Sequence, residues 1–255
     1  MKLVELLANV TDVAKINGIS EPFMVGGVPR NRILGEIDKK SEIKDIDITT
    51  GNKDSLKLVE LLHKKWEASI FNVFDDGHAS VDFLGVHFDF SSHFLVPGIE
   101  DELKRLNVKD IDHMKMEVYS RDFTINTLLE KLDFTGIYDL TGEAIDDIKA
   151  KVIRCPINPE ITIGYDPRRI IRAIKFAIKY DMKIEENLKT VMLNNRKSIQ
   201  NLPTKFVQDK INEIVSLDAD KGINMLIEFK LLPLVPLTKT VSDILIQKRK
   251  LVHAL

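Results

Sequence analysis

The sequence predicts an α+β protein whose first half mixes strands and helices and whose second half is almost entirely helical. Short apolar or alternating runs in the first half, such as PFMV at 22–25 and KDIDITT at 44–50, are typical of strands. From residue 166 onward, apolar residues recur at helical spacing instead. We therefore expect the boundary between the mixed α and β part and the helical part between residues 140 and 160.

The elements of the first half are bounded by glycines and by short polar segments. An amphipathic pattern ends at Gly18, and a glycine at this position is typical of the end of a helix. Glycine also follows the first predicted strand. The expected order is a helix at 3–17, a strand at 22–25, a short helix at 30–35, a strand at 44–50, a helix at 55–66 capped by Asn52 or Asp54, two strands within 80–92 around Leu84-Gly85, and a charged mobile loop at 97–119.

Composition excludes several classes of protein. With 44% hydrophobic and 30% charged residues, the 255-residue chain is an ordinary globular protein. Its net charge of −2 means that any nucleic-acid contact depends on a local basic patch. Cys155 is the only cysteine, which excludes a disulfide framework and a cysteine zinc site. The N-terminus is not typical of a signal peptide, and no apolar run approaches the roughly 20 residues of a membrane span. We expect a cytoplasmic protein without membrane contact.

An acidic pair is the first candidate site. Asp45 and Asp47 lie two residues apart, so a strand places both carboxylates on one face and Ile46 and Ile48 on the other. Neighbouring carboxylates repel each other unless a cation lies between them. Mg²⁺ prefers one or two carboxylates together with substrate phosphates. The pair therefore suggests a Mg²⁺ site, although solvent-facing residues on an edge strand explain an isolated D-x-D more simply.

A third carboxylate would complete a two-metal catalytic set. In VHFDFSS, at 86–92, alternation separates the two phenylalanines from His87 and Asp89. Asp89 is the first candidate for the third carboxylate, and Asp82 on the preceding strand is the second. A surface aspartate without a catalytic role explains Asp89 equally well.

The stretch VGGVPRNRILG, at 25–35, is a candidate phosphate site. Gly26 and Gly27 lack Cβ atoms, so the backbone there can adopt unusual φ angles and approach a ligand closely. A turn from a strand into a helix directs N–H groups at an anion, and Arg30 adds a charged donor. An ordinary turn is the alternative, but the D-x-D about 20 residues later favours a nucleotide site.

The segment DPRRIIRAIKFAIK predicts a helix with one apolar and one basic face. Asp166 suits the N-cap and Pro167 the first helical position. An aspartate–arginine pair formed by Asp166 and Arg169 can also present donors and an acceptor to a base edge. The apolar face comprises Ile170, Ala173, Ile174 and Ala177, and the basic face comprises Arg168, Arg172, Lys175 and Lys179.

Four ordered motifs resemble those of one enzyme family. VGGVPRNRILG, KDIDITTG, RDFTINTL and YDPRRIIRAIKFA occur in the order and spacing of the class II tRNA nucleotidyltransferases (CCA-adding enzymes) and bacterial poly(A) polymerases. The resemblance covers about residues 20–180 and continues more weakly in the helical sequence that follows. It implies a polymerase-β-like nucleotidyltransferase head with a mixed sheet at 1–145, an all-α neck at 146–200 and a short helical body at 201–255.

The same resemblance implies a reaction and a role for each motif. Members transfer nucleotides from CTP or ATP to an RNA 3′-hydroxyl without a nucleic-acid template, and the tRNA 3′ end is the expected partner. It implies that the acidic pair binds Mg²⁺ and that Asp166 and Arg169 bond to the base edge. Asp89 stays the candidate for a third catalytic carboxylate from the strand pattern alone. Further nucleotide contacts are implied for Gly26, Gly27, Arg30, Arg121, Arg172 and Lys175, with Asp122 and Asn126 as organising residues.

The sequence departs from the family pattern at several positions. Pro29 and Asn31 stand where valine and aspartate are usual, and Ser120 stands where the motif usually has its first arginine. Tyr165 replaces a glutamate, and Lys175 a frequent arginine. Because Pro29 removes a backbone donor from the phosphate turn, Gly26, Gly27 and Arg30 are expected to hold the phosphates without that N–H.

We find no counterpart of the tail with which family members grip tRNA, so we expect either weaker RNA affinity or a homodimer that supplies it. CCA addition to tRNA is the leading function. The alternatives are poly(A) addition, a tRNA-modifying toxin, and a catalytically silent RNA- or nucleotide-binding module. The intact Asp45 and Asp47 argue against a silent module.

Overall fold

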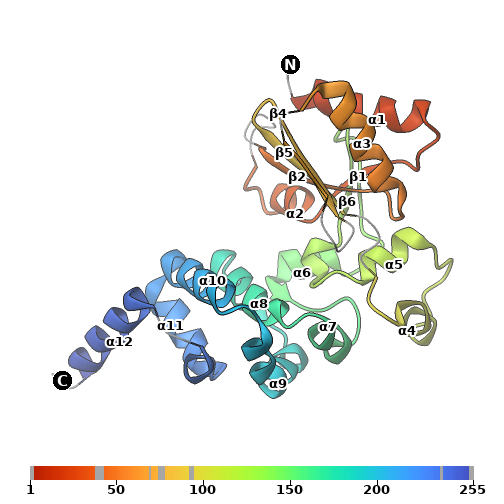
Figure 1. Cartoon of the computed structure of the whole chain (residues 1–255). Helices are drawn as coiled ribbons and strands as arrows, with labels where there is room; N and C mark the ends of the chain where they lie inside the picture. The colour runs from red at the N-terminus through yellow and green to blue at the C-terminus, as the bar shows by residue number, and fades with distance from the viewer. Residues whose placement is uncertain are drawn as a thin grey trace. The chain divides into compact units, whose positions relative to one another are not determined.

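The computed structural model describes residues 3–37, 43–68, 70–73, 78–91, 95–235 and 238–252. The chain divides into two compact units, residues 1–150 and 151–255. The first contains a mixed sheet with helices, and the second is built mainly of helices (Figure 1). The predicted fold class is therefore confirmed. The predicted three-part division, with boundaries after residues 145 and 200, stays a prediction.

A mixed sheet organises the first unit. Within the described residues it has seven strands, in the order β3-β4-β5-β2-β1-β6-β7. β2 and β5 are parallel, and the other neighbouring strands are antiparallel. The strands are β1 (Phe23–Val25), β2 (Asp45–Thr49), β3 (Ile70–Val73), β4 (Ala79–Phe83), β5 (Val86–Ser91), β6 (Leu129–Lys131) and β7 (Ile137–Tyr138).

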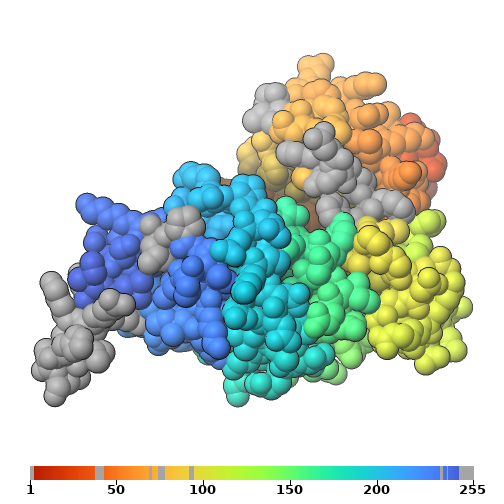
Figure 2. Space-filling view, turned by 60° about the horizontal axis from the view of Figure 1, so that its bottom comes forward, coloured from red at the N-terminus to blue at the C-terminus, as the bar shows by residue number. Residues whose placement is uncertain are grey.

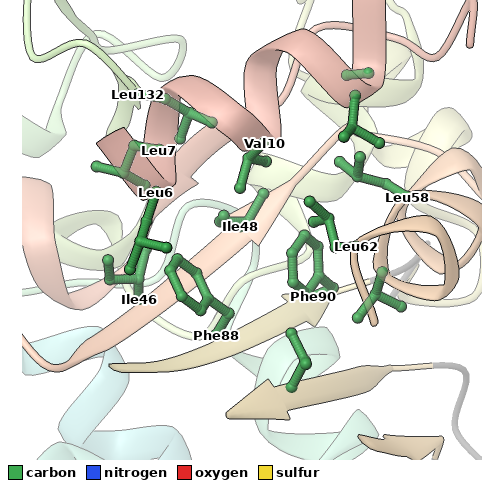
Figure 3. Packing of buried hydrophobic residues seen from close by; sticks show 14 of the residues in the cluster. Leu6, Leu7, Val10, Ile46, Ile48, Leu58, Leu62, Phe88, Phe90 and Leu132 are labelled. Atoms are coloured by element: carbon green, nitrogen blue, oxygen red, sulfur yellow. The ribbon is translucent and has the colours of Figure 1, made fainter. Parts of the chain in front are cut away.

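Alternation along β2 and β5 separates a core face from a polar face. Ile46, Ile48, Phe88 and Phe90 are at most 1% exposed, and they pack against leucines of the covering helices (Figure 3). These helices are α1 (Leu3–Ile16) and α3 (Asp54–Trp66). Successive strand residues point to opposite faces, so the core packing directs the intervening aspartates to the other face of the sheet.

The short helix α2 (Gly27–Ile33) follows β1 directly. It begins three residues before the predicted start at residue 30. Pro29 lies in its first turn, where backbone N–H groups have no acceptor within the helix, so the missing donor does not interrupt it.

The stretch at 97–119 is not a loop, and the prediction there is wrong. It contains α4 (Ile99–Arg105) and α5 (His113–Tyr119). Asp112 caps α5 by accepting a hydrogen bond from Lys115 N at 2.8 Å. Each helix has seven residues, too few for a clear periodic signal in a charged sequence. The first unit also contains the 3₁₀ helix η2 (Thr124–Asn126) and α6 (Ala144–Ala150).

The second unit is predominantly helical, and Figure 2 shows it as a continuous surface coloured from green to blue. The prediction is confirmed for α8, whose four predicted apolar residues are all buried. Two short strands form an additional parallel pair. The elements are β8 (Val152–Ile153), α7 (Pro159–Tyr165), α8 (Arg168–Lys179), β9 (Lys183–Ile184), α9 (Glu186–Asn195), η3 (Arg196–Asn201), α10 (Thr204–Leu217), α11 (Ala219–Glu228), η4 (Leu232–Leu234) and α12 (Lys239–Val252).

In the described ranges, no helix combines the length and the apolar character that crossing a membrane requires.

Candidate active site

Three aspartates lie on the polar face of the two central strands. Asp45 and Asp47 are exposed on β2, while their neighbours Ile46 and Ile48 are buried. The parallel register pairs Asp47 with Asp89 of β5 and Asp45 with His87. Directly paired residues place their side chains on the same face of a sheet. The structure therefore brings the first candidate for the third carboxylate beside the acidic pair.

The second candidate, Asp82, has a different neighbour. It pairs with His87 across β4 and β5, and its carboxylate contacts His87 Nδ1. Burial by itself would lower the pKa of His87. The hydrogen bond and charge of Asp82, together with the charges of Asp45 and Asp89, outweigh burial and hold that pKa above its usual 6.5. The histidine thus lies in a negative field that extends over this face of the sheet.

The glycine turn touches the same acidic face. Gly26 has a φ of 73°, a region that favours glycine. A Cβ atom at this position would lie 2.9 Å from Asp47 Oδ2 and 3.6 Å from Arg121 Nη1. The missing side chain therefore lets a carboxylate of β2 and a guanidinium of the RDFTIN segment approach the backbone of the turn. Sequence spacing indicated the glycine, and the structure supplies its steric reason.

A hydrogen-bonded chain runs from Arg30 into the RDFTIN segment. Arg30 is 6% exposed; its Nε donates to Asn31 Oδ1 at 3.0 Å, and its Nη1 donates to Asn126 Oδ1. Asn126 Nδ2 donates to Asp122 Oδ1 at 2.9 Å, and the same oxygen accepts from Phe123 N. The organising residues suggested by the sequence therefore lie behind Arg30 and restrict its orientation.

Sequence reasoning missed Glu117. Its carboxylate belongs to α5, is 1% exposed, and accepts hydrogen bonds from Thr49, Ser91 and Arg121. Arg121 is thus held by an ion pair and also donates to Ser91 Oγ at 3.3 Å. Because the stretch at 97–119 was expected to be a loop, Glu117 had no predicted position. Its spacing of four residues before Arg121 is a helical contact that could have drawn attention to it.

In the second unit, Asp166 lies between α7 and α8. Its Oδ1 accepts from Arg168 N at 2.9 Å, but α8 begins at Arg168 with Pro167 as its N-cap, one residue later than the sequence suggested. Arg168 Nε donates to both carboxylate oxygens, at 2.8 and 3.0 Å. Arg169 is 7% exposed, and its guanidinium lies 5.5 Å from the ring centre of Tyr165. The Arg169 guanidinium therefore lies over the face of the Tyr165 ring, which restricts its position.

The remaining basic candidates of α8 differ in their surroundings. Arg172 is exposed, and its guanidinium lies 5.3 Å from the ring centre of Phe176. Lys175 forms an ion pair with Glu213 of α10. Two helices of the second unit are therefore joined by a residue that the resemblance implies is near the nucleotide.

Ser120 has a structural role where the family pattern has arginine. It is 2% exposed; its Oγ accepts from Val96 N at 3.0 Å and donates to Met116 O at 2.7 Å. A hydroxyl can make both contacts in this confined space. This serine therefore anchors the segment that precedes α4 to the end of α5.

Residues 22–154 match the family described as "Poly A polymerase head domain", which covers just over half of the chain. The chain belongs to this family. The resemblance inferred from the four motifs is therefore confirmed, and the glycine turn, the three aspartates and the RDFTIN segment all lie within the matched residues.

Curated relatives of this poly(A) polymerase head-domain protein include CCA-adding enzymes. That of Staphylococcus saprophyticus is 27% identical over 86% of this chain, and that of Oceanobacillus iheyensis is 26% identical over 83%. These matches cover 52% and 50% of the relatives, so the chain spans about half of their length. A CCA-adding enzyme solved with ATP matches 90% of this chain and 52% of its own, with 24% identity and a TM-score of 0.69, which supports the fold.

The carboxylates of this head domain are the available donors for the metal that the family implies. Within the described residues, no group of three His, Cys, Asp or Glu side chains is arranged to hold a metal ion by itself. Asp45 and Asp47 are nevertheless exposed on one strand face. Mg²⁺ is typically bound by one or two carboxylates and completes its shell with water and substrate phosphates. The two aspartates fit a metal that arrives with a nucleotide.

Proposed function

We propose that the protein is a template-independent RNA nucleotidyltransferase that adds C and A from CTP and ATP to the 3′ end of tRNA. The observation that carries this proposal is the convergence of Asp47, Arg121 and the Gly26 turn on one exposed face of the sheet. Such a face can receive a negatively charged triphosphate beside the carboxylates that bind its metal. The CCA-adding relatives at 26% and 27% identity support the choice of substrate.

The site residues are assigned as follows. Asp45 and Asp47 bind Mg²⁺, and Asp89, paired with Asp47, adds the third carboxylate. Held by these carboxylates, Mg²⁺ would supply Lewis-acid chemistry that lowers the pKa of the RNA 3′-hydroxyl and offsets the charge of the departing pyrophosphate. The Gly26–Gly27 turn and Arg30 bind the triphosphate. Arg121 contacts the nucleotide, and Asp122 and Asn126 orient Arg30 through their hydrogen bonds. The protein acts by positioning and by electrostatic stabilisation of the transferred phosphoryl group.

Base selection is assigned to the second unit. Asp166 offers an acceptor and Arg169 offers donors in a fixed plane, which together match the Watson–Crick edges of cytosine and adenine. The ring of Tyr165 restricts the Arg169 guanidinium. Arg172 and Lys175 add positive charge on the same helix. The division into a head, neck and body, and a cytoplasmic location where tRNA and nucleotides are present, belong to the same proposal.

A nucleotide-addition assay tests the activity. The full chain is incubated with Mg²⁺ and each labelled nucleotide on three versions of one tRNA, ending before CCA, after C-C and after C-C-A. We expect C addition to the first, a single A on the second and no addition to the third. The absence of any addition, with Mg²⁺ and all three tRNAs present, would contradict the proposal.

Addition of A alone is the second candidate. The relative from Geobacter sulfurreducens named an A-adding tRNA nucleotidyltransferase is 29% identical over 74% of this chain, and the matching family model is that of poly(A) polymerase. The same three tRNAs separate the candidates. A single A on the C-C end without C addition indicates an A-adding enzyme, and a long A tail on every RNA indicates a poly(A) polymerase.

A further inference from the structure

Glu117 is buried among polar groups at one end of the candidate active site. The residue is 1% exposed, yet it carries a carboxylate. Burying a charged group costs free energy unless hydrogen bonds and an opposite charge compensate for it. Here Arg121 supplies the opposite charge, with Nη2 lying 3.1 Å from Oε1. A carboxylate buried in this way restricts the positions of the groups that hydrogen-bond to it and balance its charge.

The two oxygens of Glu117 bind different partners. Oε2 accepts from Thr49 Oγ1 at 2.5 Å, and Oε1 accepts from Ser91 Oγ at 3.2 Å in addition to Arg121. Thr49 and Ser91 are the paired last residues of β2 and β5. They follow the Asp47–Asp89 pair by two residues on each strand, so their side chains lie on the same face of the sheet. Glu117 therefore ties α5 to the two strands that carry the catalytic carboxylates.

A close backbone approach keeps α5 at these strand ends. A Cβ atom on Gly51, two residues after β2, would lie 2.9 Å from the Cα of Met114 in the first turn of α5. Gly51 N also donates to Thr49 Oγ1 at 2.9 Å, so the Thr49 hydroxyl accepts from the turn and donates to Glu117. The helix is thus fixed at both Met114 and Glu117, and its distance from β2 is set by a glycine.

Arg121 is the group whose position this arrangement determines. One side of its guanidinium bonds to Glu117 and Ser91, and Nη1 reaches to 3.6 Å from the Cβ position of Gly26. The same point lies 2.9 Å from Asp47 Oδ2. A long arginine side chain loses considerable rotamer freedom when it is ordered, and Glu117 makes that loss part of folding rather than of nucleotide binding.

We propose that Glu117 is a positioning residue of the nucleotidyltransferase site, holding the Arg121 guanidinium against the Gly26 turn so that it meets the incoming nucleotide already oriented. The inference rests on the proposed function for its kinetic consequence. Its structural part, the orientation of Arg121 by Glu117, can be measured without activity. Glu117 does not touch the reacting atoms, and its effect passes through Arg121.

The test compares Glu117→Gln with a matched control, Glu102→Gln, in the full chain. Glu102 is also a buried glutamate of the first unit, but it belongs to α4, where its carboxylate pairs with Arg105. A glutamine offers one acceptor oxygen and turns an N–H₂ group toward a donor. We expect Glu117→Gln to raise the nucleotide KM about tenfold or more, with a smaller fall in kcat, and Glu102→Gln to leave both unchanged.

One further readout separates positioning from a merely structural role. The Arg121 Nε–Hε resonance is expected to shift in Glu117→Gln and to stay in place in Glu102→Gln, whether or not the wild type adds nucleotides. If Glu117→Gln does not fold, Ser91→Ala removes one hydroxyl from the same network and is expected to raise the nucleotide KM about threefold.

The outcomes distinguish the two proposals. A wild-type protein that adds no nucleotide refutes the proposed function, and the Arg121 resonance then decides the positioning role. An active wild type whose KM changes equally, or not at all, in Glu117→Gln and Glu102→Gln refutes the positioning role. An unmoved Arg121 resonance in a folded Glu117→Gln variant refutes it as well.

Discussion

Asp47 and Asp89 are paired residues of two parallel strands, although 42 positions separate them in the sequence. Their register places both on the face of the sheet opposite the hydrophobic core, where Gly26 and Arg121 also converge. The core residues on either side of each aspartate therefore determine where the carboxylates point. Packing on one face of the sheet and chemistry on the other depend on the same register.

Gly26→Ala is expected to remove activity by a steric effect. The new Cβ would lie 2.9 Å from Asp47 Oδ2, so the carboxylate must shift. The matched control is Gly142→Ala, because Gly142 has a φ of 72° and no atom within 4 Å of its Cβ position. Both variants should lose about 1 kcal/mol of unfolding free energy through backbone strain, measured by urea denaturation.

Only Gly26→Ala should also lower nucleotide addition, by about tenfold or more, because a displaced Asp47 would no longer hold the proposed metal in a productive position. Equal activities of the two alanine variants would contradict a close functional contact between the turn and Asp47.

Arg169→Lys is expected to impair nucleotide choice more than folding. The guanidinium of Arg169 lies against the Tyr165 ring and presents a planar set of donors, which an ammonium group cannot reproduce. The ratio of kcat/KM for CTP to that for UTP, measured on tRNA lacking CCA, should fall about tenfold. Lys179→Arg, at the exposed end of the same helix, is the control. Unchanged selectivity in Arg169→Lys would reject the assignment of base reading to this residue.

The pH dependence of stability should reveal the contact between Ser20 and Asp54. Ser20 donates to Asp54 Oδ2 from its backbone N at 3.1 Å and from its Oγ at 2.9 Å. These bonds lower the pKa of Asp54 below its usual 3.8. A lowered folded-state pKa stabilises the protein above the unfolded-state value, and this contribution disappears as the pH falls through the folded-state pKa.

The unfolding free energy of Asp54→Asn should therefore be lower than that of the wild type by the same amount at pH 7 and pH 5. The difference should shrink as the pH falls below about 4, and urea titrations at each pH measure it. A free-energy difference between wild type and Asp54→Asn that grows as the pH falls would contradict a stabilising role of the Asp54 carboxylate.

Four strands, β1, β2, β4 and β5, could be predicted from the sequence, and alternation in β2 and β5 gave the orientation of their side chains. Asp45, Asp47 and Asp89 were assigned to the polar face from the isoleucines and phenylalanines between them. The partner of each strand could not be predicted, because pairing depends on long-range packing. For this reason the sequence left Asp82 as a second candidate, and only the register shows that it lies beside His87.

The helical support of the site was the part that sequence patterns could not provide. Seven residues make fewer than two full helical turns, so α5 gave no periodic signal, and Glu117 was not considered. The contact between Arg169 and Tyr165 was also missed, because the tyrosine was treated only as the loss of a usual glutamate. Glu117 and Arg121 lie four positions apart, a spacing that identifies neighbours only once a helix is known. Tyr165 ends α7 and Arg169 belongs to α8, so no helical spacing predicts their contact.

The addition of nucleotides by Asp47→Asn tests the central claim most directly. Asparagine keeps the shape of the side chain but removes the charge proposed to bind Mg²⁺. Asp101→Asn, at an exposed position of α4, is the control. With tRNA lacking CCA, Mg²⁺ and CTP, we expect kcat/KM to fall about a thousandfold in Asp47→Asn, to stay at the wild-type value in Asp101→Asn, and both proteins to unfold at similar urea concentrations. Wild-type activity in a folded Asp47→Asn variant would contradict the assignment of this face as a metal-dependent nucleotidyltransferase site.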